Sequence, residues 1–277
     1  MGEEYTKRIP TELEIEILQY IADEDEPYWS RWSALSNCAL VCKAWTEHAR
    51  RHLYYTINMN KLRGSLQFES LRRCAHLRPF VRDFKWPRMG LRDSSLYCFN
   101  ASDADIIKEI APTVMKLRFR RVDHCSLKPP LKEVISTFAN IRELDMAESI
   151  FEDWTTVIRI ISSFPFLTTL AMPRTVAAQD GGPKISYPPP TRLVNIKLAF
   201  GCESGTVNWI CTGSPIPNIQ TVEAEGQIDS NVLARLLRSL SGSLRHLIIH
   251  IGSGCAFLLI VKANFTDNYD PQSEVIS

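Results

Sequence analysis

The stretch "IRELDM" at residues 141–146 carries apolar side chains at its first, fourth and sixth positions. The same spacing recurs along most of the chain, and the middle apolar residues of successive copies are 33, 27, 26, 26, 26 and 25 residues apart. One copy arises easily by chance in a chain with 45% hydrophobic residues, but a run of nearly equal spacings does not. We therefore interpret the copies as the strands of a repeating unit. They are Val81/Phe84/Trp86, Val114/Leu117/Phe119, Ile141/Leu144/Met146, Leu167/Leu170/Met172, Leu193/Ile196/Leu198, Ile219/Val222/Ala224 and Leu244/Leu247/Ile249.

Segments with the composition of helices lie between most of these strands. They are residues 103–112, 129–139, 154–164, 205–213 and 230–240, whereas 179–192 holds too many prolines and glycines for a helix. A strand and a helix repeated about every 26 residues resemble the leucine-rich repeat, although the Asn or Cys position of that motif is missing. We expect an α/β fold over residues 75–252, a degenerate leucine-rich-repeat solenoid with a parallel sheet. An α/β sheet of alternating parallel strands and helices without a solenoid is the alternative.

The first fifty-odd residues predict two short helices whose apolar faces are unusually wide. On the first, which begins at Pro10, the apolar residues span an arc of about 220°, whereas a helix that faces one core needs only about 100°. The second apolar segment, residues 35–53, is predicted as a single helix and has apolar residues on more than one side. A module of this size cannot cover such faces by itself. Either the rest of the chain covers them, or a second polypeptide does.

Two motifs in this region resemble the F-box. They are "IPTELEIEILQYI" at 9–21 and "LSNCALVCKAWTEHARRHLY" at 35–54, with Ile9 in place of the usual Leu and an acidic connection at 22–37 that is longer than usual. The resemblance implies a helical F-box module at residues 6–58 that binds the Skp adaptor and, through it, a cullin. The residues implied to contact the adaptor are Pro10, Leu13, Ile17, Leu18, Leu40, Val41, Cys42, Trp45 and Leu53.

Residues between the apolar positions of each triplet would face the concave side of a leucine-rich solenoid. The charge of the side chains at these outward positions changes along the chain, from basic to acidic to neutral to acidic. Such a face could recognise a protein target by charge complementarity. The alternative is that they are solvated strand residues with no partner. The candidates for target binding are Lys85, Lys116, Arg118, Arg120, Glu143, Asp145, Lys197, Glu223 and Glu225.

Several classes of function find no support in the sequence. The net charge of +1 argues against a partner nucleic acid or membrane surface, and the longest apolar run, residues 255–261, is too short to span a bilayer. Cys38, Cys42, His48 and His52 cannot converge on one zinc ion from a single helix, so we expect no metal and no cofactor. No nucleophile or phosphate-binding motif occurs, and we expect no catalytic residue and no enzyme.

The eight scattered cysteines and the absence of a secretory signal predict a cytoplasmic or nuclear protein with reduced thiols. Residues 253–277 are expected to form an irregular tail or an improvised cap, or else the repeat array is truncated there. The sequence as a whole predicts a substrate-recognition subunit of a Skp–cullin–F-box ubiquitin ligase. The alternative is a repeat scaffold without catalysis, or an adaptor-bound protein with no role in ubiquitination.

Overall fold

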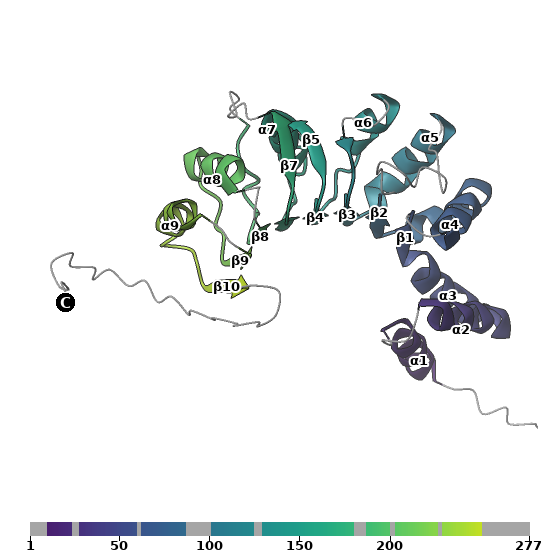
Figure 1. Ribbon diagram of the computed structural model, residues 1–277. Coiled ribbons are helices and arrows are strands. Elements are labelled where there is room, and N and C mark those ends of the chain that lie inside the picture. The colour runs from purple at the N-terminus through teal and green to yellow at the C-terminus, as the bar shows by residue number, and fades with distance from the viewer. Residues whose placement is uncertain are drawn as a thin grey trace, which may run out of the picture.

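The computed structural model describes residues 10–23, 28–59, 62–86, 101–124, 129–179, 187–199, 203–226 and 229–250. Its strands follow one another along the inner side of an arc, its helices lie along the outer side, and three helices form a separate group at one end (Figure 1). The predicted tail, residues 253–277, lies outside the described residues.

The N-terminal group consists of α1 (Thr11–Asp23), α2 (Tyr28–Val41) and α3 (Lys43–Tyr55). The prediction of a single helix over 35–53 is wrong, because the backbone at Cys42 is extended, with φ −158° and ψ 169°. The Thr46 hydroxyl stabilises this break by donating to the carbonyls of Ala39 at 2.7 Å and Cys42 at 2.9 Å. Most of the connection predicted at 22–37 is also helical, since α2 begins at Tyr28.

The three helices share a small core of their own and contact the rest of the chain on one side. The core consists of Leu18, Leu35, Ala49 and Leu53. Tyr54, near the end of α3, packs against both this core and the core of the arc, and α3 contacts the 3-10 helix η1 (Ala75–Phe80). Within the described part of the chain, these contacts cover only part of the wide apolar faces predicted from the sequence.

Eight parallel strands form the main sheet, and they are arranged in the order in which they occur in the chain. All seven strands predicted from the triplets are confirmed. The strand β1 is additional and lies inside the range 6–58 that the sequence assigns to the helical module. The strands are β1 (Thr56–Asn58), β2 (Asp83–Lys85), β3 (Lys116–Arg118), β4 (Glu143–Asp145), β6 (Thr169–Met172), β8 (Asn195–Ala199), β9 (Thr221–Glu225) and β10 (His246–His250).

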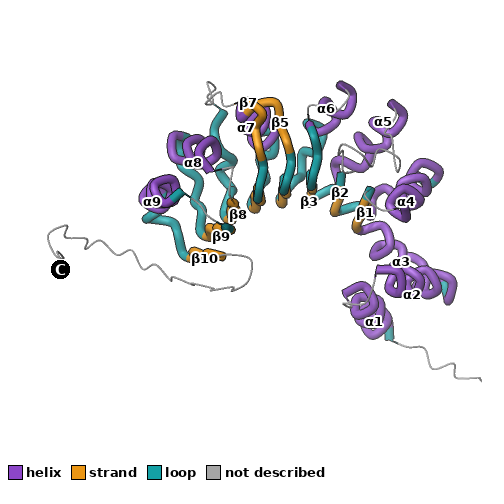
Figure 2. Tube along the Cα trace, viewed as in Figure 1, coloured by secondary structure: helices purple, strands orange, loops and turns teal. Residues whose placement is uncertain are grey.

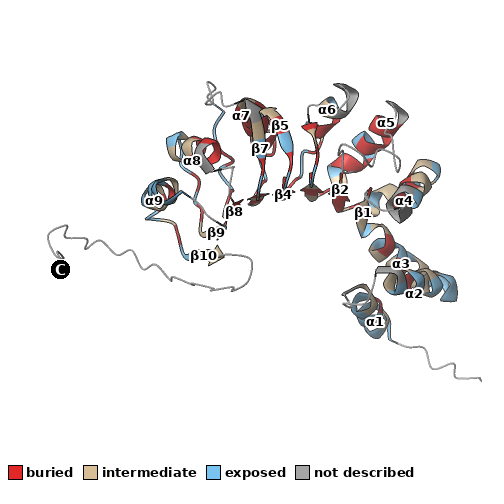
Figure 3. Cartoon of the chain, viewed as in Figure 1, coloured by how far each residue is buried: buried red, intermediate tan, exposed pale blue. Residues whose placement is uncertain are grey.

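The helices of the arc lie on one side of the sheet, as Figure 2 shows. The five predicted helices are confirmed, and within 179–192 the described residues 187–192 contain no helix. The triplet residues are buried, except Ile249, which is half-buried. Figure 3 colours the buried residues red, and they recur along the arc. The helices are α4 (Leu62–Arg73), α5 (Ala101–Ile110), α6 (Pro129–Ile135), α7 (Trp154–Ser162), α8 (Glu203–Thr212) and α9 (Ser230–Ser239), with a 3-10 turn η2 (Ala111–Thr113).

After β3, β4 and β6 the chain turns sharply at residues of positive φ and enters a second, smaller ladder. The turning residues Arg121, Glu148 and Arg174 have φ of 58°, 55° and 57° and occupy equivalent places in their units. Beyond them, β5 (Ile150–Asp153) pairs in parallel with β7 (Val176–Gln179).

Two buried hydroxyls join neighbouring units at these turns. Ser149 donates to the carbonyl of Phe119, and Thr175 donates to the carbonyl of Met146 at 2.7 Å. Both side chains are completely buried, so each satisfies a carbonyl that water cannot reach. The hydroxyls thus link successive units in a chain that lacks the Asn or Cys of the repeat motif.

Candidate adaptor-binding surface

The N-terminal helices carry a set of apolar side chains that are exposed among the residues that the structure describes. Leu40 and Val41, at the end of α2, are 85% and 66% exposed. On α1, Leu13, Ile17 and Tyr20 are exposed and share one face, because residues three and four apart are neighbours on a helix. We call these five residues the apolar surface of the module. Several exposed apolar side chains on so small a module are typical of a region that binds another protein.

The structure divides the nine residues predicted to contact an adaptor into two groups. Leu18 and Leu53 lie in the module's own core and contribute little or nothing to its surface, and Trp45 is half-buried against that core. Tyr20 is exposed and lies on the apolar surface, although it is not among the nine. The predicted residues that are exposed are Pro10, Leu13, Ile17, Leu40, Val41 and Cys42.

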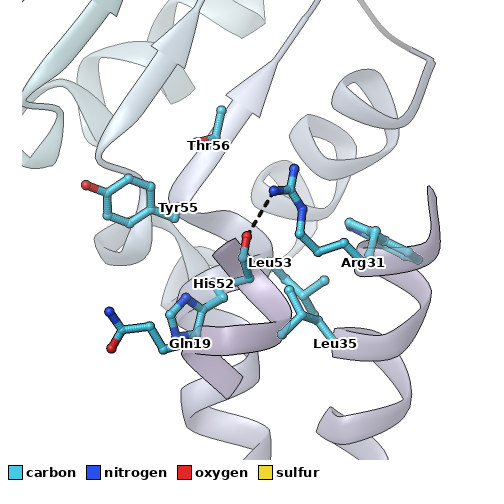
Figure 4. Close-up of a pocket in the computed structure, with 9 residues that line it drawn as sticks. Gln19, Arg31, Leu35, His52, Leu53, Tyr55 and Thr56 are labelled. Atoms are coloured by element: carbon cyan, nitrogen blue, oxygen red, sulfur yellow. Dashed lines mark hydrogen bonds between the residues drawn. The ribbon is translucent and has the colours of Figure 1, made fainter. Parts of the chain in front are cut away.

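A cavity of about 470 Å³ opens where the helices of the module meet β1 (Figure 4). Apolar side chains of Leu35 and Leu53 and polar side chains of Gln19 and His52 line it. Arg31 lies at its edge and donates to the carbonyl of Ala22 at 2.9 Å, which holds the end of α1 beside the start of α2. The cavity extends the module's own core and is separate from the exposed residues at the end of α2.

Comparison with known proteins identifies the N-terminal region. The family of F-box-like domains matches residues 6–60, which include all three helices and β1. Residues 6–60 are an F-box-like domain. F-box domains generally bind Skp-type adaptors of ubiquitin ligase complexes, so the apolar surface of this F-box-like domain is its candidate adaptor site. No curated protein matches the chain.

No helix among the described residues has the length and apolar character needed to cross a membrane. In the same part of the chain, no group of three or more His, Cys, Asp or Glu side chains could hold a metal ion.

The candidate target-binding residues lie on neighbouring strands of the sheet's inner face, and most of them pair with one another. Arg118 binds Asp83 at 2.7 Å, and Arg120 binds Asp145 at 2.6 Å. Lys116 pairs with Glu143 across β3 and β4. The remaining pairs join Lys197 to Glu223 at 2.6 Å and to Glu225 at 3.5 Å. The acids and bases that the sequence suggested for a target therefore already neutralise each other in large part.

Burial and charge act in opposite directions on these groups. Burial raises the pKa of Asp83 above its usual range, although the nearby charges of Arg118, Lys85 and Lys116 lower it. Burial alone would lower the pKa of Lys197, but the hydrogen bonds and charges of Glu223 and Glu225 outweigh it, and the pKa is raised. The carboxylate of Asp83 is thus held in a site that favours its neutral form.

Proposed function

We propose that this chain is the substrate-recognition subunit of a Skp–cullin–F-box ubiquitin ligase. The observation that carries the proposal is the exposure of Leu40 and Val41 on an F-box-like domain. The domain would dock on the Skp adaptor through its apolar surface, and the adaptor would bind a cullin. The arc of strands would hold a target protein. No residue needs to be catalytic, because holding the target raises the effective concentration of its lysines near the conjugating enzyme.

We further propose that the arc is a degenerate leucine-rich-repeat solenoid. Three features support this assignment. The parallel strands add to the sheet in chain order, the helices lie on its outer side, and the triplet residues of successive units stand in register, as Leu117 does with Leu144. The hydroxyl of Ser149 or Thr175 takes the linking role that a motif Asn or Cys would have.

A binding experiment with a purified Skp adaptor tests the ligase role. Substituting Leu40→Glu or Val41→Glu should weaken adaptor binding at least about 30-fold, since truncating the central contacts of an interface commonly costs 2 kcal/mol or more. The stability of the chain should change by less than about 0.5 kcal/mol, because both side chains are exposed. Isothermal titration calorimetry and urea unfolding measure the two effects separately.

Leu66→Glu is the matched control, because Leu66 is also exposed but lies on α4, outside the F-box-like domain. It should bind the adaptor as the unmodified chain does. Unchanged affinity in both Leu40 and Val41 variants would remove the apolar surface as the adaptor site. Failure of the unmodified chain to bind an adaptor would leave a repeat scaffold as the remaining function.

A further inference from the structure

At β3, two ion pairs of the inner face hold the guanidinium group nearer to solvent than the carboxylate. The Arg118 side chain is 21% exposed and its partner Asp83 is 5% exposed. The Arg120 side chain is 57% exposed and its partner Asp145 is 13% exposed. Lys85 stands beside Arg118 in the register of β2 and β3. Glu143 is the exception, since its side chain is 47% exposed and that of its partner Lys116 is 36% exposed. Four basic residues, Lys85, Lys116, Arg118 and Arg120, still lie against three acidic ones, Asp83, Glu143 and Asp145, so positive charge is in excess at β3.

The opposite end of the inner face presents negative charge at β9. Glu223 and Glu225 share the single ammonium group of Lys197. The remaining charge partner found there is His250, whose Nε2 lies 3.0 Å from Glu223 and which is neutral unless protonated. Two carboxylates against one permanent cation leave β9 with an excess of negative charge.

Between these two ends the inner face is formed partly by small side chains. Ala171 on β6 stands between Asp145 and Lys197 in the register, and Ala199 on β8 stands beside Glu225. Ala147 and Pro173 follow β4 and β6 at the same edge of the sheet. Ala171 and Pro173 are partly exposed, and their small side chains offer a contact for another backbone between the two charged strands, whereas Ala147 and Ala199 are buried.

We propose that the inner face of the arc binds an extended segment of a protein target, laid across the strands, with acidic side chains over β3 and basic side chains over β9. The inference rests on the proposed function, and it adds the charge arrangement and the direction of the bound segment. Four strand-to-strand steps separate β3 from β9, which is about 19 Å at the usual strand spacing. An extended chain covers that distance with about six residues.

Synthetic peptides test this arrangement on the full chain. The probe carries two glutamates, a spacer of about six glycine and serine residues, and two lysines, in both sequence orders. The comparison peptides carry glutamates at both ends, lysines at both ends, or a spacer of two residues. We expect one order of the dipolar peptide to bind about tenfold more tightly than each comparison peptide at low salt, because two modest charge contacts add about 1.4 kcal/mol. Added salt should weaken the preference.

Two substitutions locate the ends of the bound segment. Arg120→Gln should reduce the preference for a glutamate end, and Glu225→Gln should reduce the preference for a lysine end, each by about threefold. Arg142→Gln and Glu133→Gln are the matched controls, since both residues are exposed and lie outside the inner face. Equal binding of all peptides, or tightest binding of a peptide with one kind of charge, would overturn the proposal.

The adaptor-binding test and the peptide test distinguish failure of one proposal from failure of the other. A chain that binds the Skp adaptor but does not distinguish the peptides would remove this inference and leave the ligase role intact. A chain that distinguishes the peptides but binds no adaptor would remove the ligase role and leave the binding face.

Discussion

The ion pair between Asp83 and Arg118 should respond very differently to the loss of one partner or the other. Asp83 is almost completely buried, whereas the Arg118 side chain keeps 21% of its surface in contact with solvent. Arg118→Met leaves a buried carboxylate without its closest cation. Asp83→Asn leaves a partly solvated guanidinium beside an amide that can still accept a hydrogen bond. We predict that only the first substitution strongly destabilises the fold.

The structure sets the size of the two effects. Removing one partner of a buried ion pair usually costs about 3–5 kcal/mol, and here Lys85 and Lys116 still act on Asp83, so Arg118→Met should cost about 2–3 kcal/mol. The pKa of Asp83 is raised because burial outweighs those cations, which means that the folded state disfavours the charged form more than water does. Asp83→Asn should therefore change the free energy of unfolding by less than about 1 kcal/mol.

The sign of the pH dependence follows from the raised pKa of Asp83 in the folded state. A raised carboxyl pKa contributes stability that is present below the unfolded pKa and is lost as the pH rises through the folded pKa. The penalty for Arg118→Met should therefore be smaller at about pH 4.5 than at about pH 7.5. The double variant, Asp83→Asn with Arg118→Met, should recover most of the lost stability, because no buried charge remains.

Urea unfolding followed by circular dichroism measures each variant at the two pH values. An equal loss for Asp83→Asn and Arg118→Met at neutral pH would refute the reasoning, because it would mean that attraction within the pair exceeds the cost of burying the carboxylate. A double variant no more stable than Arg118→Met would refute it as well.

Two further predictions concern the packing of neighbouring units. Ser149→Ala should lower the free energy of unfolding by about 1–3 kcal/mol, because it leaves the buried carbonyl of Phe119 without its hydroxyl donor. Urea unfolding measures the change, and a loss near zero would show that this hydrogen bond contributes nothing to stability. Gly205→Ala should lower the thermal midpoint of unfolding, since a Cβ there would lie 2.6 Å from the Trp154 ring. Gly242→Ala should leave the midpoint unchanged, because nothing lies within 4 Å of a Cβ at that position. Equal midpoints for the two variants would contradict the close packing at Gly205.

The regular units could be predicted because one apolar spacing sets both the burial and the position of each strand. Even β1, which the prediction missed, carries the signal: Tyr54, Ile57 and Met59 have the triplet spacing, and Ile57 lies 27 residues before Phe84. The overlap with the helical module concealed it, since α3 runs directly into β1. The break at Cys42 had no such signal. It is stabilised by hydrogen bonds from the Thr46 hydroxyl to the carbonyls of Ala39 and Cys42, and the apolar pattern does not predict these bonds.

The two candidate sites also differ in how far the sequence could predict them. The sequence predicted that the module's helices carry more apolar surface than so few residues can bury, but it left open whether the rest of the chain or a second polypeptide covers that surface. Which residues stay inside did not follow, since Leu18 from α1 and Leu53 from α3 pack with Leu35 and Ala49 in a core formed by three helices, where the sequence predicted two. The ion pairs of the charged inner face were harder still to predict from the sequence. The strand spacing places Arg120 beside Ala147, but its guanidinium reaches diagonally to Asp145.

The pairing on the inner face also limits how the proposed target could be selected. The charged groups of such a target must compete with ion pairs that are already formed within the chain. Its affinity would therefore depend on the excess positive charge at β3 and the excess negative charge at β9 more than on the total number of charged residues. Reversing Arg118 or Arg120 alone would break a pair with Asp83 or Asp145 and disturb the sheet as well as the surface. Neutral substitutions at the exposed ends, such as Arg120→Gln and Glu225→Gln, therefore separate recognition from folding where charge reversals cannot.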